Sequence, residues 1–328
     1  MKKNYHTLHD KLIDWYERNH RVLPWRETND PYRIWISEIM LQQTRVAQAT
    51  DYYHRFINRW TTVAELAQAD EDEVLLMWQG LGYYTRARNM HKAAKMMAEK
   101  MPTSWEEWRA LPGIGDYTAG AICSFAFNLP YPAMDGNVYR VIARLMDCDM
   151  AFDTTQGKKV FQQFAWDLLD TERPKLWNQA IMEFGATYCL PQNCDCENCP
   201  IQHHCLATQH NTVALLPVRK PKAPLKDRFF HYTIFMDKNR QSLIHQRKQK
   251  DIWQHLWEFY LEETDSPSAT PPLLTHILSH QRIHATFEIR LVDSLPSLEG
   301  YKTVAWEDLE QYAFAQLTLK ALQKLGLQ

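Results

Sequence analysis

The spacing of apolar residues changes once along this chain of 328 residues. Up to about residue 205 they recur three and four positions apart, as in DEDEVLLMWQ and NMHKAAKMMAEK, which indicates helices. Further on they alternate, as in FFHYTIFM and ATFEIRLV, which is typical of strands. The stretch between them has prolines among basic residues and no clear period. We therefore predict an all-α domain over 1–205, a linker over 206–228 and a smaller α+β domain over 229–328.

The first residues, MKKNYHTLHDKLIDWY, contain no apolar run of the kind that a secretory signal needs. No stretch approaches the ~18 to 20 apolar residues of a membrane-spanning helix. We expect a cytoplasmic protein with no membrane partner that acts as a monomer. The net charge is −2, so composition alone does not indicate a nucleic-acid partner. A DNA site would have to be a local patch or use backbone amides.

The segment CLPQNCDCENCPIQHHC, residues 189–205, holds five of the seven cysteines. In a reducing compartment, clustered thiols are more often metal ligands than disulfides. A set of four gives the spacing C-x6-C-x2-C-x5-C and leaves Cys194 as an extra thiol; it comprises Cys189, Cys196, Cys199 and Cys205. Four thiolates suit a [4Fe-4S] cluster or a tetrahedral zinc ion. The single C-x2-C pair favours iron and sulfur, and unligated core cysteines are the remaining alternative.

The segment LPGIGDYTAGAI, residues 111–122, is typical of a helix, a tight glycine turn and a second helix. Gly113 and Gly115 would allow close backbone approach, and the second helix would present unpaired amides to an anion. A DNA phosphate fits such an anchor without sequence readout. A plain turn between two helices is the alternative interpretation.

Two carboxyls occupy contrasting surroundings. Glu38 stands among apolar residues in PYRIWISEIMLQQTRV, so we expect its pKa to be raised by burial. Asp135 precedes an amphipathic helix in AMDGNVYRVIARL, where it could also be an ordinary helix N-cap. Such a pair suits cleavage of a glycosidic bond, in which one carboxyl protonates the leaving group and the other stabilises a cationic sugar.

Six motifs occur in order along residues 20–205: LPWR, SEIMLQQT, GLGYYTRARN, LPGIGDYTAGA, MDGNVYRV and the cysteine segment. Together they resemble the adenine DNA glycosylase (MutY) family of the helix-hairpin-helix superfamily, whose members carry a [4Fe-4S] cluster. The resemblance implies that Glu38 is the general acid that protonates adenine and also positions water. It implies that Asp135 stabilises the oxocarbenium ion, or traps it covalently, before water adds at the sugar carbon. Tyr117 and Asn137 resemble further pocket positions, and Arg26 is similar to a residue that contacts the extruded adenine.

The resemblance also assigns residues that contact DNA outside the pocket. Gln43, Leu81 and Tyr83 match residues that the family inserts into the helix beside the lesion, and Thr44 ends the same SEIMLQQT motif. Core packing is the alternative role for Leu81 and Tyr83. Extrusion of the base costs a few kcal/mol, which such inserted residues help to offset.

The related endonuclease III family has a lysine at the position of Tyr117, where its amine forms a Schiff base with the sugar. A tyrosine cannot form that imine. The resemblance therefore implies a hydrolytic glycosylase with little or no strand-cutting lyase activity.

The C-terminal part resembles the 8-oxoguanine recognition domain of the family, a relative of the Nudix fold. DIWQHLWEF, residues 251–259, is similar to a strand-entry motif without its usual glycines, and no glutamate-rich Nudix box is present. This domain should bind rather than cut. Ser279 and His280 match residues that contact the oxidised guanine, whereas Leu278 departs from a family phenylalanine. An ordinary polar turn is the alternative.

The expected function is hydrolytic excision of adenine from double-stranded DNA where adenine stands opposite 8-oxoguanine or guanine. Arg88, Arg140 and Arg144 are candidates for a cationic patch on phosphate, although each could be a solvated helix charge. Three other functions stay open: a mismatch glycosylase with another target base, a lesion-binding protein without catalysis, and a zinc-held interaction module.

Overall fold

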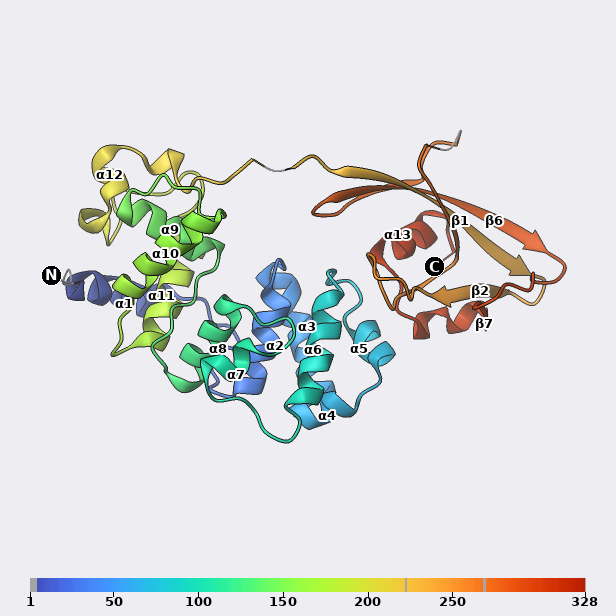
Figure 1. Ribbon diagram of the computed structural model, residues 1–328, viewed down its shortest axis with the longest axis horizontal. Helices are drawn as coiled ribbons and strands as arrows, with labels where there is room; N and C mark the ends of the chain where they lie inside the picture. The colour runs from blue at the N-terminus through green and yellow to red at the C-terminus, as the bar shows by residue number, and fades with distance from the viewer. Residues whose placement is uncertain (1–4, 222, 268–269, 328) are drawn as a thin grey trace. The chain divides into compact units, whose positions relative to one another are not determined.

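The computed structural model describes residues 5–221, 223–267 and 270–327. The chain forms two compact units, neither of which is contiguous in sequence: unit 1 comprises Met1–Val46 and Met96–Pro221, and unit 2 comprises Ala47–Lys95 and Lys222–Gln328. Figure 1 labels their elements along the chain. The division into 1–205, 206–228 and 229–328 stays a prediction.

Unit 1 is helical. Its elements are α1 (His6–Asn19), α2 (Pro31–Leu41), α7 (Trp105–Arg109), α8 (Asp116–Phe127), α9 (Gly136–Met146), α10 (Thr155–Leu168), α11 (Pro174–Thr187), η1 (Gln202–His204), α12 (Leu206–His210) and η2 (Val213–Leu215). The last two are short helices inside the stretch predicted as linker. Ala207 and Leu216 are buried in the core cluster of unit 1, which explains why the chain still packs there.

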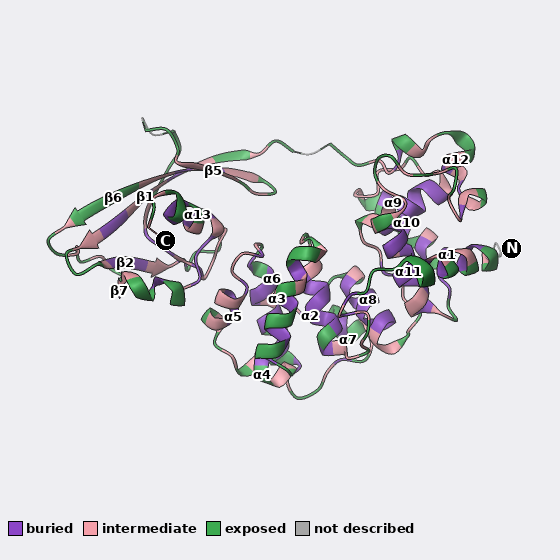
Figure 2. Ribbon diagram, turned by 180° about the vertical axis from the view of Figure 1, so that it is seen from behind, coloured by how far each residue is buried: buried purple, intermediate pink, exposed green. Residues whose placement is uncertain are grey.

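The helices of unit 1 pack through the apolar faces that the sequence predicted. One core cluster joins α1, α9, α10 and α11, and Phe161, Trp177 and Phe184 are among its buried aromatic side chains. Figure 2 shows the buried faces of α9 and α11 in purple. At the start of α2, the Asp30 side chain accepts from the amide of Tyr32, and Pro31 occupies the first turn, where it needs no partner for a backbone N–H. The start of α2, the helix that carries Glu38, is thereby fixed.

Unit 2 combines helices with two small sheets. Its elements are α3 (Val46–Arg59), α4 (Val63–Gln68), α5 (Glu71–Met77), α6 (Thr85–Met96), β1 (Lys226–Asp237), β2 (Gln241–Gln246), β3 (Trp257–Glu258), β4 (Tyr260–Thr264), β5 (Leu274–Ile277), β6 (Gln281–Val292), β7 (Lys302–Ala305), η3 (Trp306–Gln311) and α13 (Gln316–Lys324). The strand β1 begins inside the predicted linker.

The larger sheet has the strand order β4-β1-β6-β5, and the smaller has the order β3-β2-β7. The long strands β1 and β6 run side by side and parallel, from Lys226 opposite Gln281 to Asp237 opposite Val292 (Figure 1). Alternate residues of β1, among them Phe230 and Tyr232, point into a core that α13 closes with Leu317. The side chains on the opposite face of β1 are half-buried, except for Phe235, which is buried, and the exposed Asp227 at its start.

The segment DIWQHLWEF shows how a chain without glycine makes a turn that favours it. Trp253 and His255 have φ angles of +57° and +67°, the left-handed region that disfavours residues with a Cβ. Trp253 packs edge-on against Phe230, and the His255 ring pairs with Glu71. These contacts offset a backbone cost of about 1 kcal/mol per residue.

The predicted fold class is confirmed: a helical part carrying a helix-hairpin-helix motif is followed by a small α+β part. The described helices include none that is long and apolar enough to cross a membrane.

Candidate active site

The side chain of Glu38 is buried inside unit 1 on α2. Its carboxylate accepts a hydrogen bond of 2.6 Å from the hydroxyl of Tyr117, which lies in the first turn of α8. Burial raises the pKa of Glu38 to about 7, against the opposing effect of the Tyr117 hydrogen bond. The raised pKa predicted from the sequence is confirmed, and the group can hold a proton near neutral pH.

Asp135 is the N-cap of α9. One carboxylate oxygen accepts from the amides of Asn137 and Val138 at 2.9 and 2.8 Å, and the other accepts from the Asn137 side chain at 2.8 Å. Burial raises the pKa of Asp135 above its ordinary value, while these hydrogen bonds favour the ionised form. The residue is therefore an N-cap, and its charge in turn raises the pKa of Glu38. The capping role and a catalytic role are compatible.

A chain of hydrogen bonds joins Asp135 to the cysteine segment. The side-chain oxygen of Asn137 accepts from Arg140 at 3.0 Å. The same guanidinium donates to the carbonyl oxygen of Cys189 at 2.8 Å and to that of Gly185. Arg140 is buried, so its orientation is fixed by these partners. The rotamer of Asn137, and through it one oxygen of Asp135, depends on where α11 and the cysteine segment place their carbonyls.

Two glycines make this arrangement possible, and sequence reasoning missed both. A Cβ on Gly185 would lie 2.8 Å from the Cβ of Asn137 and 2.9 Å from its carbonyl oxygen. A Cβ on Gly120 would lie 2.6 Å from the carbonyl oxygen of Pro132, in the loop that leads to Asp135. Helical glycines cost about 1 kcal/mol relative to alanine, so each was a signal of close packing that the sequence offered.

Arg26 lies beside a further buried carboxylate. Its guanidinium donates to Glu183 at 2.6 Å, and Arg21 donates to the same carboxylate through both its backbone and its side chain. Burial raises the pKa of Glu183, but the hydrogen bonds from the two arginines outweigh it and lower the pKa to about 2. Glu183 was missed in the sequence, where a glutamate in IMEFG was the available signal. Arg26 also lowers the pKa of Glu38, which places its charge near the predicted acid.

The glycine hairpin has the predicted form. Gly113 has a φ of +78°, which requires glycine or a strained residue, and Gly115 is the N-cap of α8. Within the described residues, no side chain caps this end of α8. Its first amides point outward from the helix, as an anion site needs.

A cavity of about 340 Å³ opens in unit 1 against Tyr117. Five aromatic side chains and four charged or amide side chains are among the residues that line it: Trp105, Glu106, Asp116, Tyr117, Tyr131, Pro132, Met134, Tyr139, Lys158, Gln162 and Trp166. The wall formed by Pro132 and Met134 belongs to the loop that ends at Asp135. Free space therefore adjoins two of the elements that carry the predicted catalytic groups.

The cysteine segment gathers its thiols in unit 1. Burial, and then the neighbouring thiols of Cys189, Cys205 and Cys196, raise the pKa of Cys199 to about 12. The sulfurs of Cys194 and Cys196 lie 3.6 Å apart. In the described part of the chain, no three such groups are arranged as the ligands of one metal ion. Cys194 also lies beside Arg144, which donates to its sulfur at 3.6 Å.

A buried cation adjoins these sulfurs. Arg144 donates to the sulfur of Cys189 at 3.2 Å, and its other donors are met by the carbonyl oxygens of Leu190, Pro191 and Leu216. A guanidinium held by neutral carbonyls and thiols is costly to bury, and a nearby negative charge would offset the cost. Four thiolates around iron and sulfur would supply that charge, so the donor set fits such a group.

The three arginines considered for a phosphate patch do not form one. Arg88, Arg140 and Arg144 are 7, 8 and 2% exposed, and each donates to carbonyl oxygens within the fold. Both alternatives, phosphate contact and a solvated charge, are wrong. Arginine on a helix suggests a surface residue, but the planar guanidinium suits buried sites that offer several acceptors.

The residues predicted to enter DNA divide between the units. Gln43 and Thr44 follow α2 in unit 1, and Gln43 has a φ of +58°. Leu81 and Tyr83 lie in unit 2, where Leu81 is buried and Tyr83 is exposed with a φ of +47°. For Leu81, core packing describes the observed state. A left-handed backbone at a non-glycine residue is a strain that often marks functional positions.

Within unit 2, Tyr83 contacts the turn of residues 278–280 that was predicted to bind the oxidised guanine, which we call the recognition turn. Its hydroxyl lies 3.2 Å from the hydroxyl of Ser279, although the two residues are 196 positions apart. Ser279 and His280 are exposed, whereas Leu278 packs partly against the core. An apolar residue at position 278 is explained by that packing. Two residues predicted separately to contact one base pair are thus brought together.

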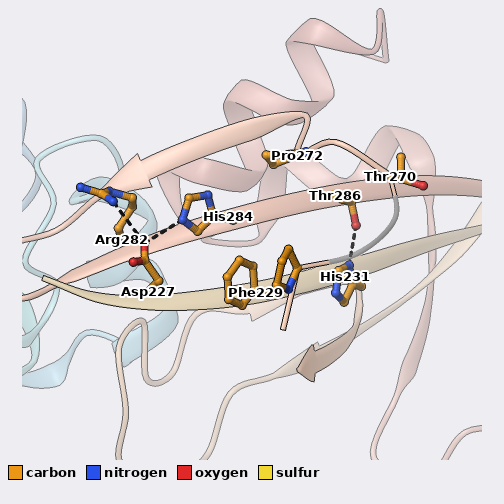
Figure 3. Close-up of a pocket in the computed structure, with 9 residues that line it drawn as sticks. Asp227, Phe229, His231, Thr270, Pro272, Arg282, His284 and Thr286 are labelled. Carbon is orange, nitrogen blue, oxygen red and sulfur yellow. Dashed lines mark hydrogen bonds and ion pairs between the residues drawn. The ribbon is translucent and has the colours of Figure 1, made fainter. Parts of the chain in front are cut away.

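A second cavity, of about 370 Å³, lies on the face of the larger sheet opposite to Phe230 and Tyr232 (Figure 3). Its polar groups pair with one another: Asp227 with His284 at 2.8 Å, and His231 with Thr286 at 2.8 Å. The ring of Phe229 stacks on His284. The turn with Ser279 and His280 is tied to the start of the neighbouring strand β1, where the amide of Lys226 donates to the carbonyl of His280 at 3.1 Å.

Comparison with family models matches two parts of the chain. Residues 36–169 match the HhH-GPD superfamily of base excision DNA repair proteins, and residues 231–324 match the NUDIX domain. The first match spans Glu38, the hairpin and Asp135, and the second spans the recognition turn.

Curated relatives are similar over longer stretches. An adenine DNA glycosylase of Buchnera aphidicola subsp. Baizongia pistaciae (strain Bp) is 34% identical over 262 residues, covering 77% of this chain and 73% of that protein. Those of Rattus norvegicus and Homo sapiens are 42 and 40% identical, each over 60% of this chain, covering 41 and 39% of their own lengths.

Solved structures share the helical fold. A thermostable thymine-DNA glycosylase aligns with a TM-score of 0.56 at 24% identity, covering 62% of this chain and 96% of its own. A non-covalent endonuclease III–DNA complex aligns with a TM-score of 0.54 at 23% identity, covering 64 and 98%. At these identities the likeness concerns the fold.

The protonation of Glu38 should respond to Tyr117. In the wild type, the signal of the protonated carboxyl should disappear as pH rises through about 7. Tyr117→Phe removes the hydrogen bond that lowers this pKa, so the midpoint should move to higher pH. Infrared difference spectra against Glu38→Gln, which lacks the carboxyl, would measure both midpoints. An unchanged midpoint in Tyr117→Phe would contradict the role given to that bond.

Proposed function

The chain belongs to the adenine DNA glycosylase family, base excision repair enzymes that hydrolyse the N-glycosyl bond of adenine, and we propose that it excises adenine standing opposite 8-oxoguanine or guanine. The observation that carries the proposal is the pair of buried carboxyls in unit 1. Glu38 holds a proton near neutral pH, and Asp135 is stabilised as a carboxylate by three hydrogen bonds.

The two carboxyls suit the two halves of a glycosidic cleavage. We assign to Glu38 the transfer of a proton to the adenine ring, which makes the base a better leaving group. The carboxylate of Asp135 then faces the positive charge that develops on the sugar, until water adds at the sugar carbon. With adenine gone, the carboxylate form of Glu38 can accept a proton from that water.

Neighbouring residues position these groups. Asn137 holds one oxygen of Asp135, so the other, which caps α9, keeps its orientation. Arg26, fixed by Glu183, would contact the extruded adenine. The uncapped first turn of α8, with Gly113 and Gly115 before it, would hold a phosphate of the same DNA strand.

The cysteine segment would hold a [4Fe-4S] cluster through Cys189, Cys196, Cys199 and Cys205. Hydrolysis transfers no electrons, so the cluster would supply a fixed negative charge and a crosslink of the segment. This chain's part is to place Arg144 against the sulfur of Cys189 and to hold the Cys189 carbonyl for Arg140. Metal-bound thiolates would satisfy the buried guanidinium.

The preference for the opposite base would reside in unit 2. Tyr83 and Ser279 are within hydrogen-bond distance and both are exposed, which supports a joint role on one base pair. Ser279 could donate to, or accept from, the altered edge of 8-oxoguanine, with His280 beside it. Gln43, Thr44 and Leu81 complete the set of residues proposed to contact DNA around the extruded adenine.

Single-turnover cleavage tests the reaction and both carboxyls. A duplex with adenine opposite 8-oxoguanine, treated with hot alkali after incubation, should break at that adenine. Glu38→Gln and Asp135→Asn should each slow the reaction by more than about 100-fold, because each removes a group that acts in the transition state. The matched control is Glu17→Gln, an exposed glutamate on α1, which should cleave like the wild type. Binding without breaks would mean a lesion sensor or another target base.

Borohydride trapping tests the absence of a lyase step. The wild type should give alkali-dependent breaks and no trapped protein–DNA adduct, because Tyr117 has no amine. Tyr117→Lys, which places an amine at that position, serves as the positive control for trapping. A nick at neutral pH together with an adduct formed by the wild type in every turnover would overturn the proposed monofunctional reaction.

Metal analysis tests the cluster apart from activity. The purified protein should be brown and contain about four iron and four sulfide per chain. Arg144→Met keeps the length of the side chain but removes its charge, so iron and sulfide content should fall. Arg18→Met, an exposed arginine on α1, should retain both. Stoichiometric zinc without sulfide would contradict the assignment.

A further inference from the structure

The contact between Tyr83 and Ser279 lies at the surface, and a single exposed hydrogen bond of this kind contributes little on its own. The two residues nevertheless belong to segments held together by buried contacts inside unit 2. Those contacts run from the α5–α6 region to two loops of the C-terminal part of the chain.

The first contact involves both backbone groups of Phe314. Its amide donates to the side-chain oxygen of Gln79 at 2.8 Å, and its carbonyl accepts from the hydroxyl of Tyr84 at 3.2 Å. Phe314 is 2% exposed and stacks on Phe259 in the core. A buried backbone group left without a partner costs about 1 to 3 kcal/mol. Both partners of Phe314 come from residues 79–84, so the docked arrangement satisfies groups that would otherwise be orphaned.

The second contact is made by Arg88. Its guanidinium donates to the carbonyl of Gln254 at 2.5 Å and to the side-chain oxygen of the same residue at 3.4 Å. Thr85 accepts a further hydrogen bond from it at 3.2 Å, which fixes its orientation on α6. Arg88 is buried, so undocking would expose or orphan a charged donor group.

A third contact lies at the N-terminal end of α5. Glu71 pairs with the ring of His255, and Asp72 accepts from Gln246 at 2.8 Å. His255, which has a φ of +67°, thus places its ring against this helix. These pairs are more exposed and contribute less than the buried ones.

Gln79 and Tyr84 flank Tyr83 in the same short segment, and Arg88 lies one helical turn beyond. We propose that Gln79, Tyr84 and Arg88 are positioning residues: they dock the C-terminal part of unit 2 so that Ser279 stands beside Tyr83, and discrimination of the oxidised guanine depends on them although none contacts DNA. This inference rests on the proposed preference for 8-oxoguanine. It predicts an effect on substrate choice rather than on the chemical step.

The test compares single-turnover rates on two duplexes, with adenine opposite 8-oxoguanine and opposite guanine. Gln79→Leu keeps the size of the side chain and removes the acceptor, and Arg88→Met removes the donors. In each, the ratio of the two rates should fall about tenfold, the effect of one lost hydrogen bond of this strength, with the rate opposite guanine unchanged within about twofold. Arg88→Lys, which keeps one donor for the Gln254 carbonyl, should restore part of the ratio. Lys92→Met, an exposed charge on the same helix, should match the wild type.

A readout independent of activity is hydrogen exchange at the amide of Phe314. It should be protected in the wild type and in Lys92→Met, and should exchange faster in Gln79→Leu. If the Phe314 amide of the wild type is unprotected, or if variants lose its protection but keep the wild-type ratio of the two cleavage rates, the positioning role is wrong. The proposed preference for 8-oxoguanine would not be affected by either result. A wild type that cleaves both duplexes equally would overturn the proposed specificity and this inference with it, while the exchange data would still report docking.

Discussion

The buried carboxyl of Glu38 is the constraint on which unit 1 depends. A buried carboxyl must either keep its proton or accept hydrogen bonds from neighbouring donors. For Glu38, burial raises the pKa to about 7, and the hydroxyl of Tyr117 donates one hydrogen bond to its carboxylate. That donor requires the start of α8 at a fixed distance from α2, and a second contact holds the two together: Gln42, just after α2, donates to the hydroxyl of Thr118 on α8 at 3.3 Å. Catalytic competence and packing thus share the same contacts.

The same logic extends to the buried cations. Arg140 and Arg144 are satisfied by carbonyl oxygens of the cysteine segment and of α11, not by solvent. Because Arg140 also holds Asn137, a shift of the Cys189 carbonyl would be felt at Asp135 through three consecutive hydrogen bonds. The cysteine segment is therefore mechanically part of the site, whatever charge its thiols carry. A group that fixes this segment would contribute to catalysis by orientation alone.

Local sequence patterns were sufficient to predict a feature wherever that feature depends on a single helix or strand. The change of period predicts helices and then strands, and Asp135 before an amphipathic helix predicts an N-cap. They failed where the partners are distant. Arg88 donates to a carbonyl 166 positions away, and Arg140 and Arg144 to carbonyls 45 to 72 positions away, so nothing near them in sequence marks them as buried. Gly185 carried a signal, a glycine inside a helix, but not the identity of the neighbour that requires it.

The proposed function divides between the two units, each described by its own internal contacts. Every group assigned to bond cleavage lies in unit 1, and its protonation is set by burial and by Tyr117, inside the same unit. The pair Tyr83 and Ser279 lies in unit 2, and is held by hydrogen bonds that are also internal to unit 2. The hydrogen bonds that hold Tyr83 and Ser279 share no partner with those of Glu38. Under the proposed function, substitutions within unit 2 should therefore alter which duplexes are cleaved. They should not change the pH at which Glu38 loses its proton, because that pH is set by contacts inside unit 1.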